Sequence, residues 1–168
     1  MNTDKGIVIT GFRGSTTGMS RHAFYRDNER VCEAFVPVLP SPTVLIEGDG
    51  YKLLSPFDMQ STIVRGLTRY VLDRDSENEV FRIVYRAAGS YEMVCGELHI
   101  TVRADAEGAS FSVDGRPAAW TEPIFEFPWA PEMPGYDVAP CFGTVLYADL
   151  NPLCTLAVLT FPILRFAI

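Results

Sequence analysis

Basic side chains, and lysines above all, are scarce in this sequence of 168 residues. It holds 14 Lys and Arg against 21 Asp and Glu, so its formal net charge is −7, and Lys5 and Lys52 are its two lysines. A nucleic-acid-binding domain is expected to carry a basic face, and polybasic segments draw proteins to anionic lipid. The charge balance therefore argues against a nucleic-acid partner. It also disfavours a membrane lipid, although the arginines could still form a local basic patch.

Clustered metal ligands and redox motifs are lacking as well. The chain has two histidines and no CxxC pair. Its four cysteines stand at long, irregular spacings: Cys32, Cys95, Cys141 and Cys154. A zinc site needs Cys and His ligands at short spacings, so we expect no metal and no cofactor. The N-terminal segment lacks the basic-then-apolar order of a signal peptide, and we therefore expect a cytoplasmic protein with free thiols.

Internal repeats and linkers are absent too, which together with the length predicts one domain over residues 1–168. Hydrophobic residues make up 48% of the chain, enough for a sizeable core. One apolar run dominates, Leu150–Ile168, in which Arg165 is the sole charge. A surface helix would show a polar face, so a helix over about 150–168 must be buried on all sides or lie in lipid.

The ends of this helix carry their own signals. Asp149 or Asn151 is suited to cap its first turn, with Pro152 at the first helical position. Pro162 should kink or loosen the helix near its end. Because the chain upstream consists of strand-like segments, we predict a helix threaded through a β-barrel.

The strand predictions come from turn signals and from alternation. Asp49-Gly50 between apolar runs predicts a hairpin, and Asp114-Gly115 predicts a second turn. The expected strands are Gly6–Phe12, Val31–Val36, Thr43–Glu47, Tyr51–Ser55, Thr68–Leu72, Val80–Tyr85, Tyr91–Arg103, Ala109–Val113 and Thr144–Ala148. We expect Arg13–Ser20 to form a turn or loop. The Pro-rich segment Trp120–Pro140 should form a covering loop that buries its aromatic side chains.

Three segments resemble tubby-like domains. YVLDRDSENEVFRIV (Tyr70–Val84) resembles their repeated strand–turn–strand unit, and GELHITV (Gly96–Val102) resembles the strand that follows. ADLNPLCTLAVLTFPILRF (Ala148–Phe166) resembles the hydrophobic helix that fills their barrel. The wider superfamily includes the tubby C-terminal domain, the plant LURP-one-related proteins and phospholipid scramblases. The resemblance, from about Gly6 to Ile168, implies a closed barrel of about twelve antiparallel strands around a central hydrophobic helix.

The superfamily's activities differ widely. Tubby domains bind phosphoinositides through a basic pocket, scramblases act at membranes, and many bacterial members have no assigned activity. This chain resembles a bacterial member, and it has neither a Lys-x-Arg motif nor a lysine pair. The resemblance thus implies a binding or scaffolding barrel more than a phosphoinositide-binding one.

Two apparent catalytic or metal motifs do not withstand inspection. Cys95, Glu97 and His99 are expected to project from one face of a strand, but Cys95 and His99 would then lie about 13 Å apart, beyond hydrogen-bond reach. The turn Asp73–Glu79 faintly resembles a calcium loop but lacks the glycine and the bidentate glutamate of that motif. We therefore predict a non-enzymatic protein.

An anion site is the one ligand-binding candidate. The segment Gly14–Gly18 could offer backbone amides to an anion, with Ser15 and Thr16 inside it and Arg13 and Arg21 at its flanks. No Gly-Lys-Ser/Thr follows, so it is not a P-loop. We expect the neighbouring His22 to be a packing or surface residue.

These observations leave three functional hypotheses. The first is a cytoplasmic, non-enzymatic tubby-like barrel that binds or scaffolds an unidentified protein or small molecule. The second is a module that binds phospholipid or a membrane surface. The third is a tail-anchored protein with residues 150–168 in the bilayer, a span at the short end of what a membrane requires.

Overall fold

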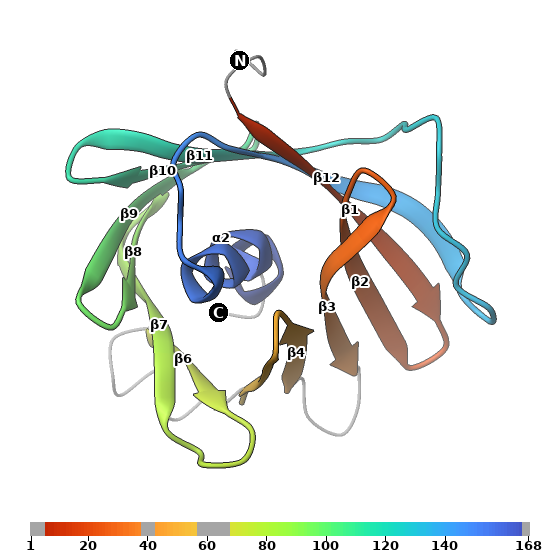
Figure 1. Ribbon diagram of the computed structural model, residues 1–168, viewed down its shortest axis with the longest axis horizontal. Helices are drawn as coiled ribbons and strands as arrows, with labels where there is room; N and C mark the ends of the chain where they lie inside the picture. The colour runs from red at the N-terminus through yellow and green to blue at the C-terminus, as the bar shows by residue number, and fades with distance from the viewer. Residues whose placement is uncertain (1–5, 38–42, 57–67, 166–168) are drawn as a thin grey trace.

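Twelve antiparallel strands form one closed barrel around a C-terminal helix in the computed structural model, which describes residues 6–37, 43–56 and 68–165 (Figure 1). The strands are β1 (Ile7–Thr16), β2 (Met19–Arg26), β3 (Glu29–Pro37), β4 (Val44–Gly48), β5 (Tyr51–Ser55), β6 (Thr68–Asp73), β7 (Glu79–Ala87), β8 (Ser90–Cys95), β9 (Leu98–Ala104), β10 (Ala109–Val113), β11 (Arg116–Pro123) and β12 (Asp137–Leu146). Neighbours follow chain order, and β12 closes the ring on β1. The predicted barrel with a central helix is confirmed.

Tight turns connect the strands where the sequence predicted them. Asp49 and Gly50 have φ of 50° and 80°, and Asp114 and Gly115 have φ of 53° and 75°. Two successive left-handed residues are the mark of the type I′ turn, whose twist matches that of the flanking strands. These Asp-Gly pairs set the hairpins β4–β5 and β10–β11.

The helix α2 (Pro152–Arg165) lies inside the barrel. Asn151 caps it, because its Oδ1 accepts a hydrogen bond of 2.8 Å from the backbone N–H of Cys154. Every residue from Leu156 to Leu164 is buried. Pro162 does not end the helix, which continues for three residues beyond it. Among the described residues, no helix has the length and hydropathy needed to cross a bilayer.

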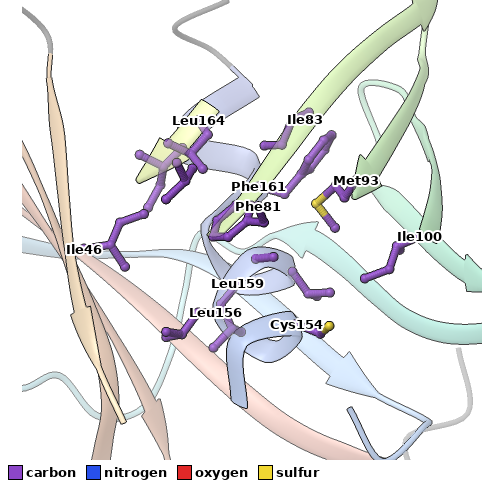
Figure 2. Packing of buried hydrophobic residues seen from close by; sticks show 14 of the residues in the cluster. Ile46, Phe81, Ile83, Met93, Ile100, Cys154, Leu156, Leu159, Phe161 and Leu164 are labelled. Carbon is purple, nitrogen blue, oxygen red and sulfur yellow. The ribbon is translucent and has the colours of Figure 1, made fainter. Parts of the chain in front are cut away.

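The core forms between α2 and the inward side chains of the strands. Figure 2 shows Ile46, Phe81 and Met93 of the wall around Leu159 and Phe161 of the helix. Each fully buried side chain of this size contributes about 1.5–3 kcal/mol to folding. The helix therefore supplies one side of the principal core.

The carboxyl end of α2 is capped from the wall by Arg69, which is 4% exposed. Its Nη1 donates a hydrogen bond of 3.4 Å to the carbonyl oxygen of Leu164, and its Nε donates one of 2.7 Å to Ser55 Oγ. Burial lowers the pKa of Arg69 to about 10, so the guanidinium stays charged at neutral pH. A cation here also complements the negative end of the helix dipole.

A smaller second core lies on the outer face of β1 and β2. The loop between β11 and β12 packs there: Phe12 is fully buried, and Trp129 contacts it edge-to-face at 5.4 Å between ring centroids. The predicted covering loop thus exists, but its first residues continue β11 and its last residues begin β12. The expected burial of its aromatics is wrong for Phe125, which is 86% exposed, and for Phe127, which is 42% exposed.

Some strand predictions are also wrong. Residues 19–26 and 116–123 form β2 and β11, which the pattern did not indicate. Residues 91–103 are not one strand: a turn at Gly96, where φ is 63°, separates β8 from β9. The last strand begins at Asp137 rather than Thr144 and ends at Leu146.

Candidate functional site

Arg13 and His22 lie directly opposite each other on β1 and β2. Opposed residues of an antiparallel pair project from the same face of the sheet, and both of these line a cavity beside the end of α2, where His22 is buried and Arg13 is exposed. Ser20 joins them on β2, where its Oγ accepts a hydrogen bond of 3.4 Å from Arg13 Nη2. Three polar side chains thus meet on one patch of inner wall.

A β-bulge adds a fourth polar group. β12 pairs Phe142 with Gly11 but Pro140 with Phe12, so Cys141 is an extra residue in the ladder. Bulges are common at the rims of barrels, where they redirect a side chain. Here the bulge brings Cys141 to the same cavity as Arg13.

Apolar side chains complete the lining. Val36 of β3, Phe142 of β12, and Pro162 and Ile163 of α2 form the remaining wall. The cavity, which we call the Arg13 cavity, has a volume of about 340 Å³. That volume lies within the range of small-molecule sites, about 300–1,000 Å³. The helix α2 thus fills the core of the barrel and also forms part of the wall of the Arg13 cavity.

The electrostatics of the Arg13 cavity are simple. Burial, with a smaller effect of the Arg13 charge, lowers the pKa of His22 to about 4. Burial raises the pKa of the Cys141 thiol to about 12. At neutral pH the imidazole and the thiol are therefore both uncharged, which leaves Arg13 as the sole charge among the described lining residues.

His22 has an unmet hydrogen-bonding need. The residue is 9% exposed, and its buried Nδ1 has no hydrogen-bond partner among the described residues. Buried polar atoms in folded proteins are nearly always paired, so each exception requires an explanation. This atom has essentially no accessible surface, so the part of His22 that borders the Arg13 cavity is the rest of its ring.

The structure places the residues of the predicted anion loop on two paired strands. Arg13–Ser20 is not a loop, because β1 extends to Thr16 and β2 begins at Met19. Its amides take part in the pairing of Ser15 with Ser20 and of Thr16 with Met19, so they are not gathered around an anion.

The two predicted arginines lie on opposite faces of the sheet. Arg21 pairs across the ladder with Gly14, on the outer face, and its Nη2 lies 2.7 Å from Glu33 Oε2. Gly14 is a packing residue, since a Cβ there would come within 2.8 Å of Met133 Sδ in the covering loop. Of the four predicted residues, Arg13 is the one that lines the Arg13 cavity.

The expectation that Cys95, Glu97 and His99 share a strand face is wrong, since a turn separates them. Cys95 is buried in the core, where a hydrogen bond with Cys154 and burial raise its pKa. His99 lies on the outer surface and contacts Glu92 through its Nδ1. A thiol held protonated and an imidazole on the opposite side of the wall form no nucleophilic site.

The acidic turn Asp73–Glu79 stabilises itself without a metal. Asp73 Oδ2 accepts hydrogen bonds from the backbone N–H and the hydroxyl of Ser76, at 2.8 and 2.9 Å. These bonds lower the pKa of Asp73. In the described part of the chain, no group of three or more His, Cys, Asp or Glu side chains is placed to hold a metal ion.

Two further cavities border the helix. One of about 160 Å³ shares Phe142 and Pro162 with the Arg13 cavity. Another, of about 430 Å³, lies beside the first turn of α2 and is lined by both acidic and basic residues, among them Glu29 and Arg30. Neither contains an unpaired buried polar atom like that of His22.

Sequence reasoning missed Ser20, His22 and Cys141. Ser20 and His22 alternate with Arg21 along β2, a signal that a strand prediction would have used. Cys141 could not have been found this way, because its direction depends on the bulge.

Comparison of the chain with family models, with curated proteins and with solved structures yields no match. The site is therefore interpreted from its own geometry.

Proposed function

We propose that this chain is a non-enzymatic binding module whose ligand is a small molecule held in the Arg13 cavity. The observation that carries the proposal is a cavity of about 340 Å³ in which the polar side chains of Arg13, Ser20 and His22 meet an apolar wall. Mostly apolar cavities with a few convergent polar groups are typical of ligand sites. The scaffold is suited to this role, since a closed barrel holds its inner wall rigidly.

The non-enzymatic part rests on protonation states. Cysteine catalysis needs a thiolate, which a neighbouring cation or imidazolium stabilises. In the Arg13 cavity, burial moves the pKa of Cys141 up and that of His22 down. Both shifts oppose the ion pair that such catalysis requires.

The tubby-like assignment and a cytoplasmic location belong to the same proposal. The family assignment is supported by the three resembling segments and by the order of strands and helix along the chain. The location is supported by the four cysteines, which are all free thiols in the structure, as expected in a reducing compartment.

The membrane hypotheses are less well supported. The apolar residues of α2 from Leu156 to Leu164 are buried against the barrel wall, so this segment is not presented to lipid. Outer arginines are partly neutralised: Arg21 pairs with Glu33, Arg74 with Glu47 and Arg86 with Glu92. A lipid headgroup would compete with these partners.

Chemical-shift mapping tests the proposal. We expect at least one of benzyl alcohol, benzamide, benzoate and benzylamine to shift the amide resonances of Ser20, His22 and Cys141 in a saturable manner. Val36→Phe, which fills the Arg13 cavity, should abolish these shifts, and Ser20→Leu serves as a second blocking variant. His99→Gln, on the outer surface, is the matched control. Shifts confined to the outer surface, or none from any compound, would contradict the proposal.

A further inference from the structure

We infer that the ligand of the Arg13 cavity is a small monocarboxylate with a hydrophobic body. The inference rests on the proposed function and adds the chemical class of the ligand. The carboxylate would lie at Arg13, Ser20 and His22, and the body would lie against Phe142, Pro162 and Ile163.

The single positive charge of the cavity, that of Arg13, favours a ligand with one negative charge. Arg13 lines the cavity without any carboxylate among the described lining residues. Arg13 also forms no ion pair with a described residue, whereas Arg21 on the opposite face is paired with Glu33. The guanidinium of Arg13 is exposed, so it is accessible to an anion that enters the cavity.

A carboxylate suits the cavity better than a phosphate does. A guanidinium offers two parallel N–H groups that match the two oxygens of a carboxylate. Ser20 adds a hydroxyl, and a neutral imidazole has one N–H to donate. A phosphate near neutral pH carries close to two negative charges, and the cavity has one cation to balance them.

The apolar part of the cavity defines the body of the ligand. Val36, Phe142, Pro162 and Ile163 present hydrocarbon surface and no side-chain polar atom. A cavity of about 340 Å³ lies at the small end of the range of ligand sites, about 300–1,000 Å³. A single aromatic ring or a short alkyl chain with one carboxylate has this size.

Calorimetric titration of the full chain at constant ionic strength separates the effect of the ligand's charge on affinity from the effect of its shape. Benzoate, benzamide and benzylamine share one ring and differ in charge. We expect a dissociation constant of about 0.1–1 mM for benzoate, about tenfold weaker binding for benzamide, and no detectable binding of benzylammonium.

Variants then assign the effect to Arg13. Arg13→Met should bring benzoate to the level of benzamide. Arg103→Met makes the same change of net charge at an exposed position of β9 and should leave the preference for benzoate intact. A loss of that preference in both variants would mean bulk electrostatics and would overturn the inference.

The remaining outcomes separate the inference from the proposed function. Equal binding of benzoate and benzamide that Val36→Phe abolishes would overturn the carboxylate assignment and leave a small-molecule site. No binding of any probe to the wild-type cavity would contradict both. Phosphatidylserine vesicles carry the same carboxylate in a headgroup, and we expect them not to pellet the protein. Pelleting that benzoate reverses would assign the cavity to lipid and overturn the inference.

Discussion

Arg13 and Arg21 are eight positions apart in the chain, yet they lie on opposite faces of the barrel wall. The difference decides what each can do, because Arg21 is paired with Glu33 outside while Arg13 lines a cavity without a carboxylate. At the scale of single residues, function here depends on which face a side chain occupies. The alternation of a strand sets that face.

The protonation of His22 should make the protein less stable in mild acid. Its folded pKa of about 4 lies below the unfolded value of 6.5, so as pH falls the unfolded state takes up a proton first. Stability is therefore full above pH 6.5 and is lost as pH falls toward about 4. Between pH 6.5 and 5 we expect a loss of about 1.5 kcal/mol in the free energy of unfolding.

Urea unfolding at several pH values measures this loss. His22→Gln should flatten the profile in that interval, and His99→Gln should leave it sloped. A His22→Gln profile as steep as that of the wild type would show that His22 is not the group responsible.

Arg13 could be found from the sequence as an anion candidate, because it stands beside small and hydroxyl residues. Its neighbours in the cavity could not be predicted, since the polar segment 13–20 is typical of a loop and not of two paired strands. In this segment hydroxyl, glycine and arginine residues stand where a strand usually alternates apolar and polar residues. The sequence pattern that indicates a strand is therefore absent there. The position of Cys141 in the cavity could not be predicted for a different reason. A β-bulge changes the face of the sheet to which a side chain points, and it leaves no recognisable sequence pattern.

At the scale of elements, α2 is the centre of the fold and Arg69 holds its carboxyl end. The sequence predicted this helix well because a helix without a polar face is stable only when it is buried on all sides or lies in lipid. Its start was also readable, since Asn151 and Pro152 are suited to a cap and a first turn. The contribution of Arg69 could not be predicted from the sequence, because its hydrogen bond to Leu164 joins residues 95 positions apart.

A charge placed inside α2 should unfold the barrel. Leu156 is 3% exposed in the principal core, and an unpaired carboxylate there has a large desolvation cost. We expect Leu156→Asp to lose the cooperative thermal transition, followed by circular dichroism. Thr155→Asp, one residue away in the first turn and partly exposed, should melt close to the wild-type temperature. A cooperative transition in Leu156→Asp near that of the wild type would contradict the role of α2 as core.

At the scale of the whole molecule, the barrel combines a net charge of −7 with outer arginines that are partly paired to glutamates. A basic residue near an anionic membrane contributes about 1 kcal/mol, and nearby carboxylates offset it. These ion pairs thus further reduce the positive charge that the few basic residues of the chain can present to a membrane.

The protein should not bind anionic membranes at physiological salt. We expect it to stay in the supernatant when vesicles containing phosphatidylserine or phosphoinositide are sedimented. Should binding occur, Arg13→Glu with Arg21→Glu should reduce it. Salt-sensitive pelleting with phosphoinositide vesicles would favour the lipid-binding hypothesis over the one proposed.

The central claim, that the Arg13 cavity holds a small monocarboxylate, is tested most directly by a crystal structure of the protein soaked in benzoate. The account predicts one benzoate in the Arg13 cavity, with its carboxylate within hydrogen-bond distance of Arg13 and its ring against Pro162 and Ile163. A cavity without benzoate at saturating concentration, with the probe bound elsewhere or not at all, would contradict the account.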